Sequence, residues 1–438
     1  MSEECHPLVA SNKKLQCSEN GVEITKKGLG LFSATVFVAG EMAGSGVLAL
    51  PKAVVNCGFI GLILLLVFCG NAAYGGIKLG HCWQIIEERY PEHRKSTRNP
   101  YAVIADKAVG NFGSYLVSHC IRITLFGAGT VYILLAAQIF QELFANVLPV
   151  MSSCSYFLII ATLLVPPMWL ASPKEFHYVG VGALFTTIIA CILFFIQIIF
   201  DGTLESNKPI HRVHGFKDFF LSFGTLLFAF GGASTFPTIQ NDMRNKKQFS
   251  TCVLVASGVI LFLYLPLSAA GYYVYGEAVQ YNITLSLTKS AYVYVANILM
   301  AVHLIFAFLI VTNPVSQELE ESFNVPKVFG WKRCFLRTMM MIAMMLIGET
   351  FPQFGVILSL IGGSTITLLT FVFPPFFYMR LCDMESPKWS KRIIPLHEKI
   401  YMWQLVVIGL FGGCASTYSS INTIFGSDSF TKPCYWVQ

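Results

Sequence analysis

The sequence predicts an all-α membrane protein with about eleven transmembrane helices, two of which are interrupted. Of its 438 residues, 55% are hydrophobic and only 12% are charged, and the mean hydropathy is +0.61. Soluble domains carry about 25% charged residues, so this composition indicates a membrane protein. Apolar stretches near the ~20 residues needed to cross a bilayer recur along the chain. Glycine-rich breaks interrupt the first and the sixth of these stretches.

The apolar stretches give the expected helices in chain order. We place them at 29–55, 58–83, 115–147, 154–171, 178–200, 217–240, 250–275, 291–317, 334–350, 353–380 and 401–425. The ninth and tenth are separated by only a tight turn at Phe351-Pro352-Gln353. The lipid bilayer is therefore the expected surroundings of a transmembrane domain over residues 29–425.

The flanking segments and the charges set the expected orientation. Residues 1–28 contain no apolar core long enough for a cleaved signal peptide, so we expect a cytoplasmic N-terminal tail. Most of the 30 Lys and Arg residues then fall on the cytoplasmic side, as the positive-inside rule requires. An odd helix count makes residues 426–438 an extracellular or lumenal tail. The net charge of +6 does not indicate nucleic acid, because the basic residues lie mostly in loops.

The first break follows a carboxylate inside the first expected helix. Glu41 stands three residues before Gly44-Ser45-Gly46. A charge at the bilayer centre costs about 2.5–3.5 kcal/mol on insertion scales, so such groups usually face a cavity or an ion path. A helix loses its hydrogen bonds most easily at glycine. An interrupted helix beside an ionisable group is typical of secondary transporters, whose freed backbone groups bind the substrate.

The second break lies in the sixth expected helix, at Gly231-Gly232-Ala233-Ser234-Thr235-Phe236-Pro237. Small residues also allow close helix packing, and this explains either break alone about as well as a binding role. Corresponding breaks in two five-helix halves favour a binding site.

The backbone groups at the two breaks suit an amino-acid-like zwitterion. Amides at the start of the second half-helix would attract a carboxylate, and carbonyls that end the preceding half-helices would accept hydrogen bonds from an ammonium group. The candidate substrate-binding residues are Gly40, Gly44, Ser45, Gly46, Val47, Phe228, Ala229, Phe230 and Tyr132.

Three motifs resemble those of a known family. Gly44-Ser45-Gly46-Val47-Leu48-Ala49-Leu50-Pro51 resembles the first-helix motif of the amino acid/auxin permease family (amino acid transporter transmembrane family). Two other segments are similar to that family's motifs: Phe228–Gly232 leading into Phe236-Pro237-Thr238-Ile239-Gln240, and Gly271-Tyr272-Tyr273-Val274-Tyr275-Gly276. The resemblance covers nearly the whole chain after the tail. It implies a LeuT-like five-plus-five inverted repeat with broken helices one and six, and amino acid transport that is often proton-coupled.

Two ionisable residues are candidates for proton coupling. Burial favours the neutral form of a carboxyl group, so Glu41 could load a proton on an acidic side and release it to the cytosol. The alternative for Glu41 is a structural role at the broken helix. His303, within the eighth expected helix, could relay protons or equally be a hydrogen-bonded packing residue.

Three further residues are candidates for modification or cross-linking on the predicted outer side. Asn282-Ile283-Thr284 is a glycosylation sequon. Cys154 and Cys434 could form a disulfide there. The other cysteines lie mostly in apolar segments, and the sequence has no Cys-x-x-Cys pair, so zinc is not indicated.

We therefore expect a secondary active transporter of small neutral amino acids, coupled to protons and working by alternating access. Sodium coupling, through Glu41 or hydroxyls such as Thr312, and a transporter-like amino acid sensor remain alternatives. No catalytic triad or cofactor motif is present in the sequence, so an enzyme is not expected. The oligomeric state stays open, as does the choice between the plasma membrane and an endolysosomal or vesicle membrane.

Overall fold

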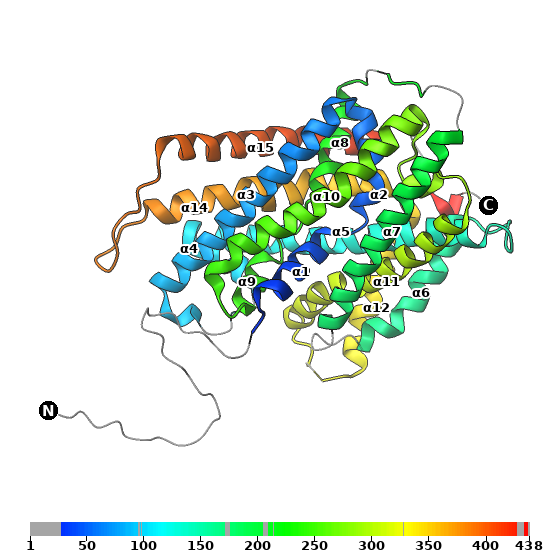
Figure 1. Ribbon diagram of the computed structural model, residues 1–438. Helices are drawn as coiled ribbons and strands as arrows, with labels where there is room; N and C mark the ends of the chain where they lie inside the picture. The colour runs from blue at the N-terminus through cyan, green and yellow to red at the C-terminus, as the bar shows by residue number, and fades with distance from the viewer. Residues whose placement is uncertain are drawn as a thin grey trace.

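The computed structural model is almost entirely helical (Figure 1). It describes residues 28–94, 97, 99–170, 176–204, 209–212, 214–326, 328–426 and 433–436. Nearly all of the expected N-terminal tail and most of the C-terminal tail lie outside these residues. The α-helices are α1 (Leu31–Met42), α2 (Gly46–Cys57), α3 (Ile60–Arg89), α4 (Pro100–Val109), α5 (Asn111–Phe144), α6 (Ser153–Leu170), α7 (Phe176–Leu204), α8 (Phe216–Ala229), α9 (Phe236–Asp242), α10 (Phe249–Tyr275), α11 (Ala291–Ser322), α12 (Trp331–Thr350), α13 (Phe354–Ile361), α14 (Phe373–Asp383) and α15 (Leu396–Phe425).

Within the described residues, eight helices are long and apolar enough to cross a membrane. The pair α1 and α2, bent by 56° at the first break, passes the same test as one broken span. The pair α8 and α9 and the helix α12 are not among these spans. The total of eleven spans and the inverted repeat therefore stay predictions.

Two local features differ from the sequence analysis. Helix α4 was not expected, although Pro100 at its first turn and Gly110 after its end, with φ of 85°, are ordinary start and stop signals. Between α13 and α14 the chain forms two π-helical turns, Gly362–Ile366 and Leu368–Val372. Such turns are rare and frequently mark functional sites.

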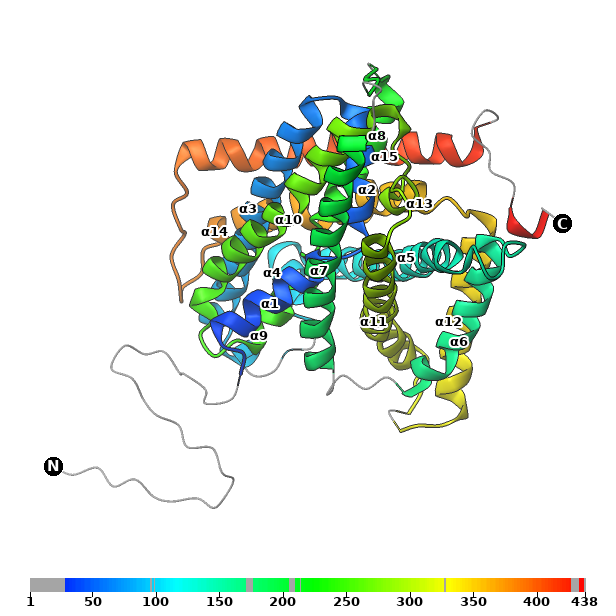
Figure 2. The ribbon, with the colours of Figure 1, turned by 45° about the vertical axis from the view of Figure 1, so that its right-hand side comes forward.

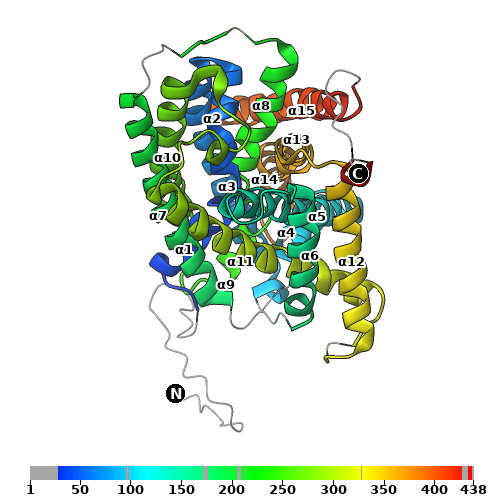
Figure 3. The ribbon, with the colours of Figure 1, turned by 90° about the vertical axis from the view of Figure 1, so that its right-hand side faces the viewer.

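The helices form two packed groups around the breaks. In the first group α2 packs against α8, while α3 and α1 pack against α10. In the second group α5 packs against α11 and α6, and α6 packs against α12. Figure 2 shows α3 and α10 side by side, away from α5 and α11, and Figure 3 shows α6 beside α12. Helix α7 contacts both α11 and α10 and so joins the two groups.

A short backbone bridge ties the start of α1 to the end of α9. The Leu29 amide donates to the Asp242 carbonyl at 2.8 Å, and the Arg244 amide donates to the Leu29 carbonyl at 2.9 Å. Arg244 Nε also donates to the Gly28 carbonyl at 2.7 Å. The two half-helices on the predicted cytoplasmic side are thus joined by three hydrogen bonds.

Candidate binding site at the two helix breaks

The first break leaves several backbone groups without helical partners. The Ala43 amide still donates to the Ala39 carbonyl, at 2.7 Å. In the described part of the chain, the amides of Gly44, Ser45 and Gly46 make no backbone hydrogen bond. Helix α2 begins at Gly46 without a side-chain cap. The Gly44 amide lies against the Tyr264 hydroxyl, so the amides of Ser45 and Gly46 are the free groups of this N-terminus, and they suit an anion.

The second break is similar but is partly closed by turns. The Gly231 amide donates to the Phe228 carbonyl at 3.0 Å, and the Thr235 amide donates to the Gly232 carbonyl at 3.1 Å. The carbonyls of Ala229 and Phe230 accept no backbone hydrogen bond from the described residues. They remain free to accept one from a ligand.

The two breaks lie directly against each other. A Cβ atom added to Gly46 would come within 2.7 Å of Ala229 Cα. One added to Gly44 would come within 3.0 Å of the Tyr132 hydroxyl. Only glycine therefore allows α2 to approach α8 this closely, and the structure brings together residues of the two breaks and Tyr132 on α5.

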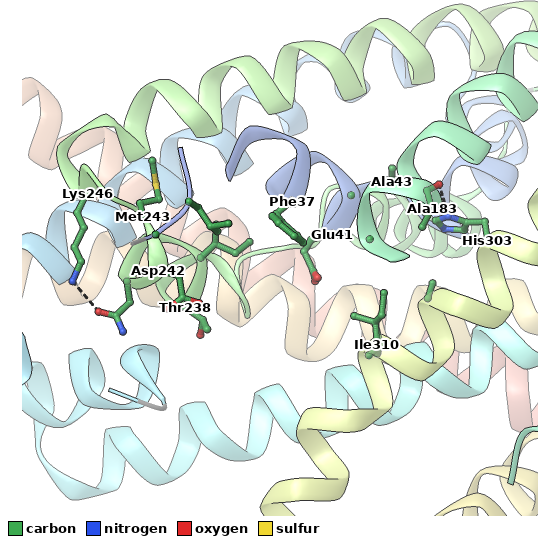
Figure 4. Close-up of a pocket in the computed structure, with 18 of the residues that line it drawn as sticks. Phe37, Glu41, Ala43, Ala183, Thr238, Asp242, Met243, Lys246, His303 and Ile310 are labelled. Carbon is green, nitrogen blue, oxygen red and sulfur yellow. Dashed lines mark hydrogen bonds between the residues drawn. The ribbon is translucent and has the colours of Figure 1, made fainter. Parts of the chain in front are cut away.

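A cavity of about 660 Å³ reaches from the protein surface to the first break. Its outer rim includes the exposed Arg94 and Asp242, and its inner end includes Glu41, Tyr132 and His303. Figure 4 shows Lys246, Met243 and Asp242 at one end, Ala183 and His303 at the other, and Glu41 between them. The rim lies on the side that the charges predict to be cytoplasmic.

Glu41 is the carboxylic acid that lines this cavity next to the two breaks. Its carboxylate points into the open space below α1 (Figure 4). The Thr235 side chain lies against it, and the Thr235 hydroxyl donates to the Gly232 carbonyl at 3.0 Å. Among the described residues no cationic side chain pairs with Glu41. An acid without a counter-ion, in contact with a cavity, is well placed to bind a cation or a proton.

His303 is buried, with only 1% of its surface exposed. Its Nδ1 atom lies 2.9 Å from the Ala183 carbonyl and 2.9 Å from Thr187 Oγ1. A carbonyl only accepts hydrogen bonds, so we assign the ring proton to Nδ1. Nε2 is then an unprotonated nitrogen, and it has no partner among the described residues.

A second cavity, of about 40 Å³, adjoins the breaks on the side of α5 and the π-helical turns. Glu41, Tyr132 and Val311 line both cavities. Sequence reasoning missed most of the residues that close the smaller one, because π-helical turns have no simple sequence pattern. These residues are Thr124, Leu125, Ala128, Val311, Ile366, Leu369 and Thr370.

The predicted substrate-binding residues fall into two sets. Gly40 and Tyr132 line the larger cavity, and Gly44, Gly46, Phe228 and Tyr132 line the smaller one. Ser45, Val47, Ala229 and Phe230 are buried in the helix ends behind them and line neither cavity. Only their backbone groups can contribute to binding.

The glycosylation prediction for Asn282 does not fit the folded structure. The residue is only 1% exposed, and its Nδ2 atom donates to Gln138 Oε1 at 3.4 Å. Its Oδ1 atom accepts from the amide and hydroxyl of Thr284, at 3.1 and 2.9 Å. The three sequon residues fold into a tight, buried turn, so a glycan on Nδ2 has no room.

The structure contains a disulfide between Cys154 and Cys434, whose Cα atoms are 5.8 Å apart. It connects the start of α6 to the 3-10 turn Cys434–Trp436. Neither cysteine lines the two cavities at the breaks, so the bond has a structural role.

The chain is similar in sequence to a family of known transporters. The profile of a family described as "Transmembrane amino acid transporter protein" matches residues 27–422. Amino acid transporter AVT1D of Arabidopsis thaliana is 26% identical over 428 residues, which is 95% of this chain and 74% of the relative. Amino acid transporter AVT1J of Arabidopsis thaliana is 24% identical over 410 residues, 90% of this chain and 92% of the relative.

A solved structure shows the same fold. It is the Eremococcus coleocola manganese transporter in complex with an aromatic bis-isothiourea substituted compound. The TM-score is 0.59 at 14% sequence identity, covering 91% of this chain and 88% of that chain. This likeness confirms the LeuT-like fold class.

Proposed function

Since this chain belongs to the transmembrane amino acid transporter family, we propose that it carries small neutral amino acids across its membrane by proton-coupled symport. Membership confirms the resemblance seen in the sequence and identifies a transporter rather than an enzyme. Our proposal concerns the substrate, the coupling ion and the transport cycle.

The observation that carries the proposal is the pairing of free backbone groups with one acid at the same cavity. The amides of Ser45 and Gly46 suit the α-carboxylate of an amino acid, and the carbonyls of Ala229 and Phe230 suit its α-ammonium group. Glu41 stands beside these groups without a cationic partner. None of the described residues that line the smaller cavity is cationic, which disfavours an acidic substrate side chain, and a volume of about 40 Å³ leaves no room for a long basic one.

In the proposed cycle, protonation neutralises Glu41 and favours the loaded protein. The large cavity then exposes the carboxyl group to the cytoplasm, where the proton and the amino acid leave. Because coupling between two ligands is reciprocal, loss of the proton then favours loss of the amino acid, and loss of the amino acid favours loss of the proton. His303, with its unpaired Nε2 in the same cavity wall, is a second candidate for the proton path.

The test is uptake of a radiolabelled amino acid panel into proteoliposomes. A proton gradient without sodium and a sodium gradient without a proton gradient are imposed in turn, for the wild type, Glu41→Gln and His303→Gln. We expect concentrative uptake under the proton gradient alone. Glu41→Gln should lose this proton dependence but keep exchange of internal for external amino acid.

Glu142→Gln is the matched control. Glu142 lines neither cavity, and its Oε2 atom lies 3.8 Å from Nζ of the exposed Lys289. Proton-driven uptake by Glu41→Gln at the wild-type rate would exclude Glu41 as the coupling site. Uptake driven by sodium alone would replace proton symport with sodium symport. Tight binding of an amino acid without uptake under either gradient would favour a sensor.

A further inference from the structure

Thr370 carries a hydroxyl group that lacks a hydrogen-bond partner at the wall of the small cavity. The residue is 2% exposed, and Oγ1 has no partner among the described residues. Thr370 lies in the π-helical turn Leu368–Val372 and lines the small cavity beside the breaks. A buried hydroxyl without a partner costs about 1–3 kcal/mol, so such groups require an explanation.

Other threonines in the helices show what is unusual about Thr370. The hydroxyls of Thr130, Thr225 and Thr312 each donate to the carbonyl four residues earlier, at 3.2, 3.1 and 2.7 Å. Thr367, between the two π-helical turns, donates to the Gly362 carbonyl five residues earlier, at 2.7 Å. Thr370 does neither, because the helix register changes at this point, and its hydroxyl stays available to a ligand.

The remaining wall of the small cavity is apolar on this side. Leu125 and Ala128 come from α5, Val311 from α11, and Ile366 and Leu369 from the π-helical segment. The Leu369 carbonyl accepts a 2.6 Å hydrogen bond from the Tyr101 hydroxyl, which holds this segment in place. On this side the Thr370 hydroxyl therefore faces a mostly apolar wall. The hydroxyl of Thr124, also in the wall, is already paired with that of Thr365 at 2.6 Å, and Glu41, Tyr132 and Ser234 line the part of the cavity next to the breaks.

The size of the cavity limits what can enter. The cavity volume is about 40 Å³. One water molecule needs about 10–15 Å³ of such volume. Roughly three water-sized groups would fill it. A methyl or hydroxymethyl group fits this space, whereas a branched or aromatic side chain does not.

We propose that the small cavity binds the side chain of the transported amino acid, and that Thr370 Oγ1 hydrogen-bonds to a hydroxyl on that side chain. The substrate's α-carboxylate and α-ammonium groups lie at the breaks, where the two cavities meet. Serine is then preferred over alanine, and leucine is excluded by Ile366 and Ala128. This inference rests on the proposed amino acid transport.

The experiment measures KM and the maximal rate for alanine, serine and leucine with the reconstituted full chain. Thr370→Val keeps the shape of the side chain but removes the hydroxyl. We expect its KM for serine to rise by about three- to tenfold, the worth of one hydrogen bond, with the KM for alanine little changed. Thr370→Ser should restore the preference for serine.

Thr367→Val is the matched control, because it removes a neighbouring hydroxyl that lines neither cavity. Its ratio of serine to alanine KM should equal that of the wild type. A second variant, Ile366→Ala, enlarges the cavity and should admit leucine. It keeps the inference testable if Thr370→Val does not fold.

The outcomes separate this inference from the function on which it rests. Wild-type uptake together with an unchanged serine-to-alanine ratio in Thr370→Val would overturn the role of Thr370 alone. Wild-type uptake of leucine as efficient as that of alanine would overturn the side-chain subsite. A folded wild-type protein that transports no amino acid would overturn both proposals.

Discussion

The Tyr264 hydroxyl donates a 2.7 Å hydrogen bond to the carbonyl oxygen of Met42, the last residue of α1. Tyr264 is fully buried on α10. The bond replaces a helical partner that the Met42 carbonyl loses at the break. The Gly44 amide lies against the same hydroxyl. A neighbouring span thus stabilises the interrupted backbone, while the amides of Ser45 and Gly46 stay without a backbone partner among the described residues.

Replacement of this partner tests how far it supports the break. Tyr264→Phe removes the hydroxyl and leaves the buried Met42 carbonyl without its partner. We expect unfolding in detergent to require about 1–3 kcal/mol less free energy, and transport to fall. Tyr273→Phe, on the same helix but 55% exposed, is the control. Equal melting temperatures for the two variants would argue against this role.

Gly46 sets how closely α2 and α8 approach. In Gly46→Ala the new methyl group would meet the Ala229 backbone, which cannot rotate away as a flexible side chain can. Overpacking of this kind costs about 1–3 kcal/mol, so we expect uptake to fall about tenfold or more. Gly70→Ala adds a methyl group where no atom lies within 4 Å and should transport normally. Normal uptake by Gly46→Ala would show that the helices can separate without loss of function.

The bridge between α1 and α9 depends on Gly28. Its φ of 152° is a conformation that side chains rarely adopt, and an added Cβ would lie 2.9 Å from the Asp242 carbonyl oxygen. Gly28→Ala should weaken the bridge at a cost of about 1–3 kcal/mol. The bridge lies at the rim of the larger cavity, which Ile310 lines. We therefore expect Gly28→Ala to change the rate at which a thiol reagent, added from the cytoplasmic side, labels a cysteine placed at position 310.

Gly30→Ala is the control for this effect, since no atom lies within 4 Å of its added Cβ. Identical labelling rates for the two alanine variants would mean that the bridge does not govern access to the cavity.

Arg337 is buried in an ion pair that connects three helices. Its Nε donates to Glu320 Oε1 at 2.6 Å, and a guanidinium nitrogen donates to the Met168 carbonyl at 2.6 Å. Arg337→Met leaves the Glu320 carboxylate buried without its main partner, which costs about 3–5 kcal/mol. We expect a large fall in thermal stability, partly recovered in Arg337→Met/Glu320→Leu. A double variant less stable than the single one would contradict this account.

The sequence predicted the breaks well, because they depend on local backbone chemistry. Gly44 lies between α1 and α2, which begins at Gly46, and Gly231 and Gly232 lie between α8 and α9, as expected from the weakness of glycine in helices. The membrane fold class followed from the composition of the chain and from its long apolar stretches. The turn at Phe351-Pro352-Gln353 also separates two helices as expected.

Features that depend on tertiary contacts could not be read from the sequence. The hydrogen bond from Tyr264 joins residues far apart in the chain, and the π-helical turns that place Thr370 have no local pattern. The Asn282 sequon matched the glycosylation pattern, but the contact with Gln138 on α5 buries it. A sequence motif specifies residue types, but the exposure of those residues depends on what packs against them in the fold.

The Cys154–Cys434 bond, across a sequence separation of 280 residues, closes the chain from α6 to its C-terminal turn into a covalent ring. A protease that cuts a single loop inside this ring does not release a fragment. The two pieces migrate as one molecule until a reducing agent opens the bond. Cleavage maps of the loops between α6 and α15 will therefore differ between reducing and non-reducing gels.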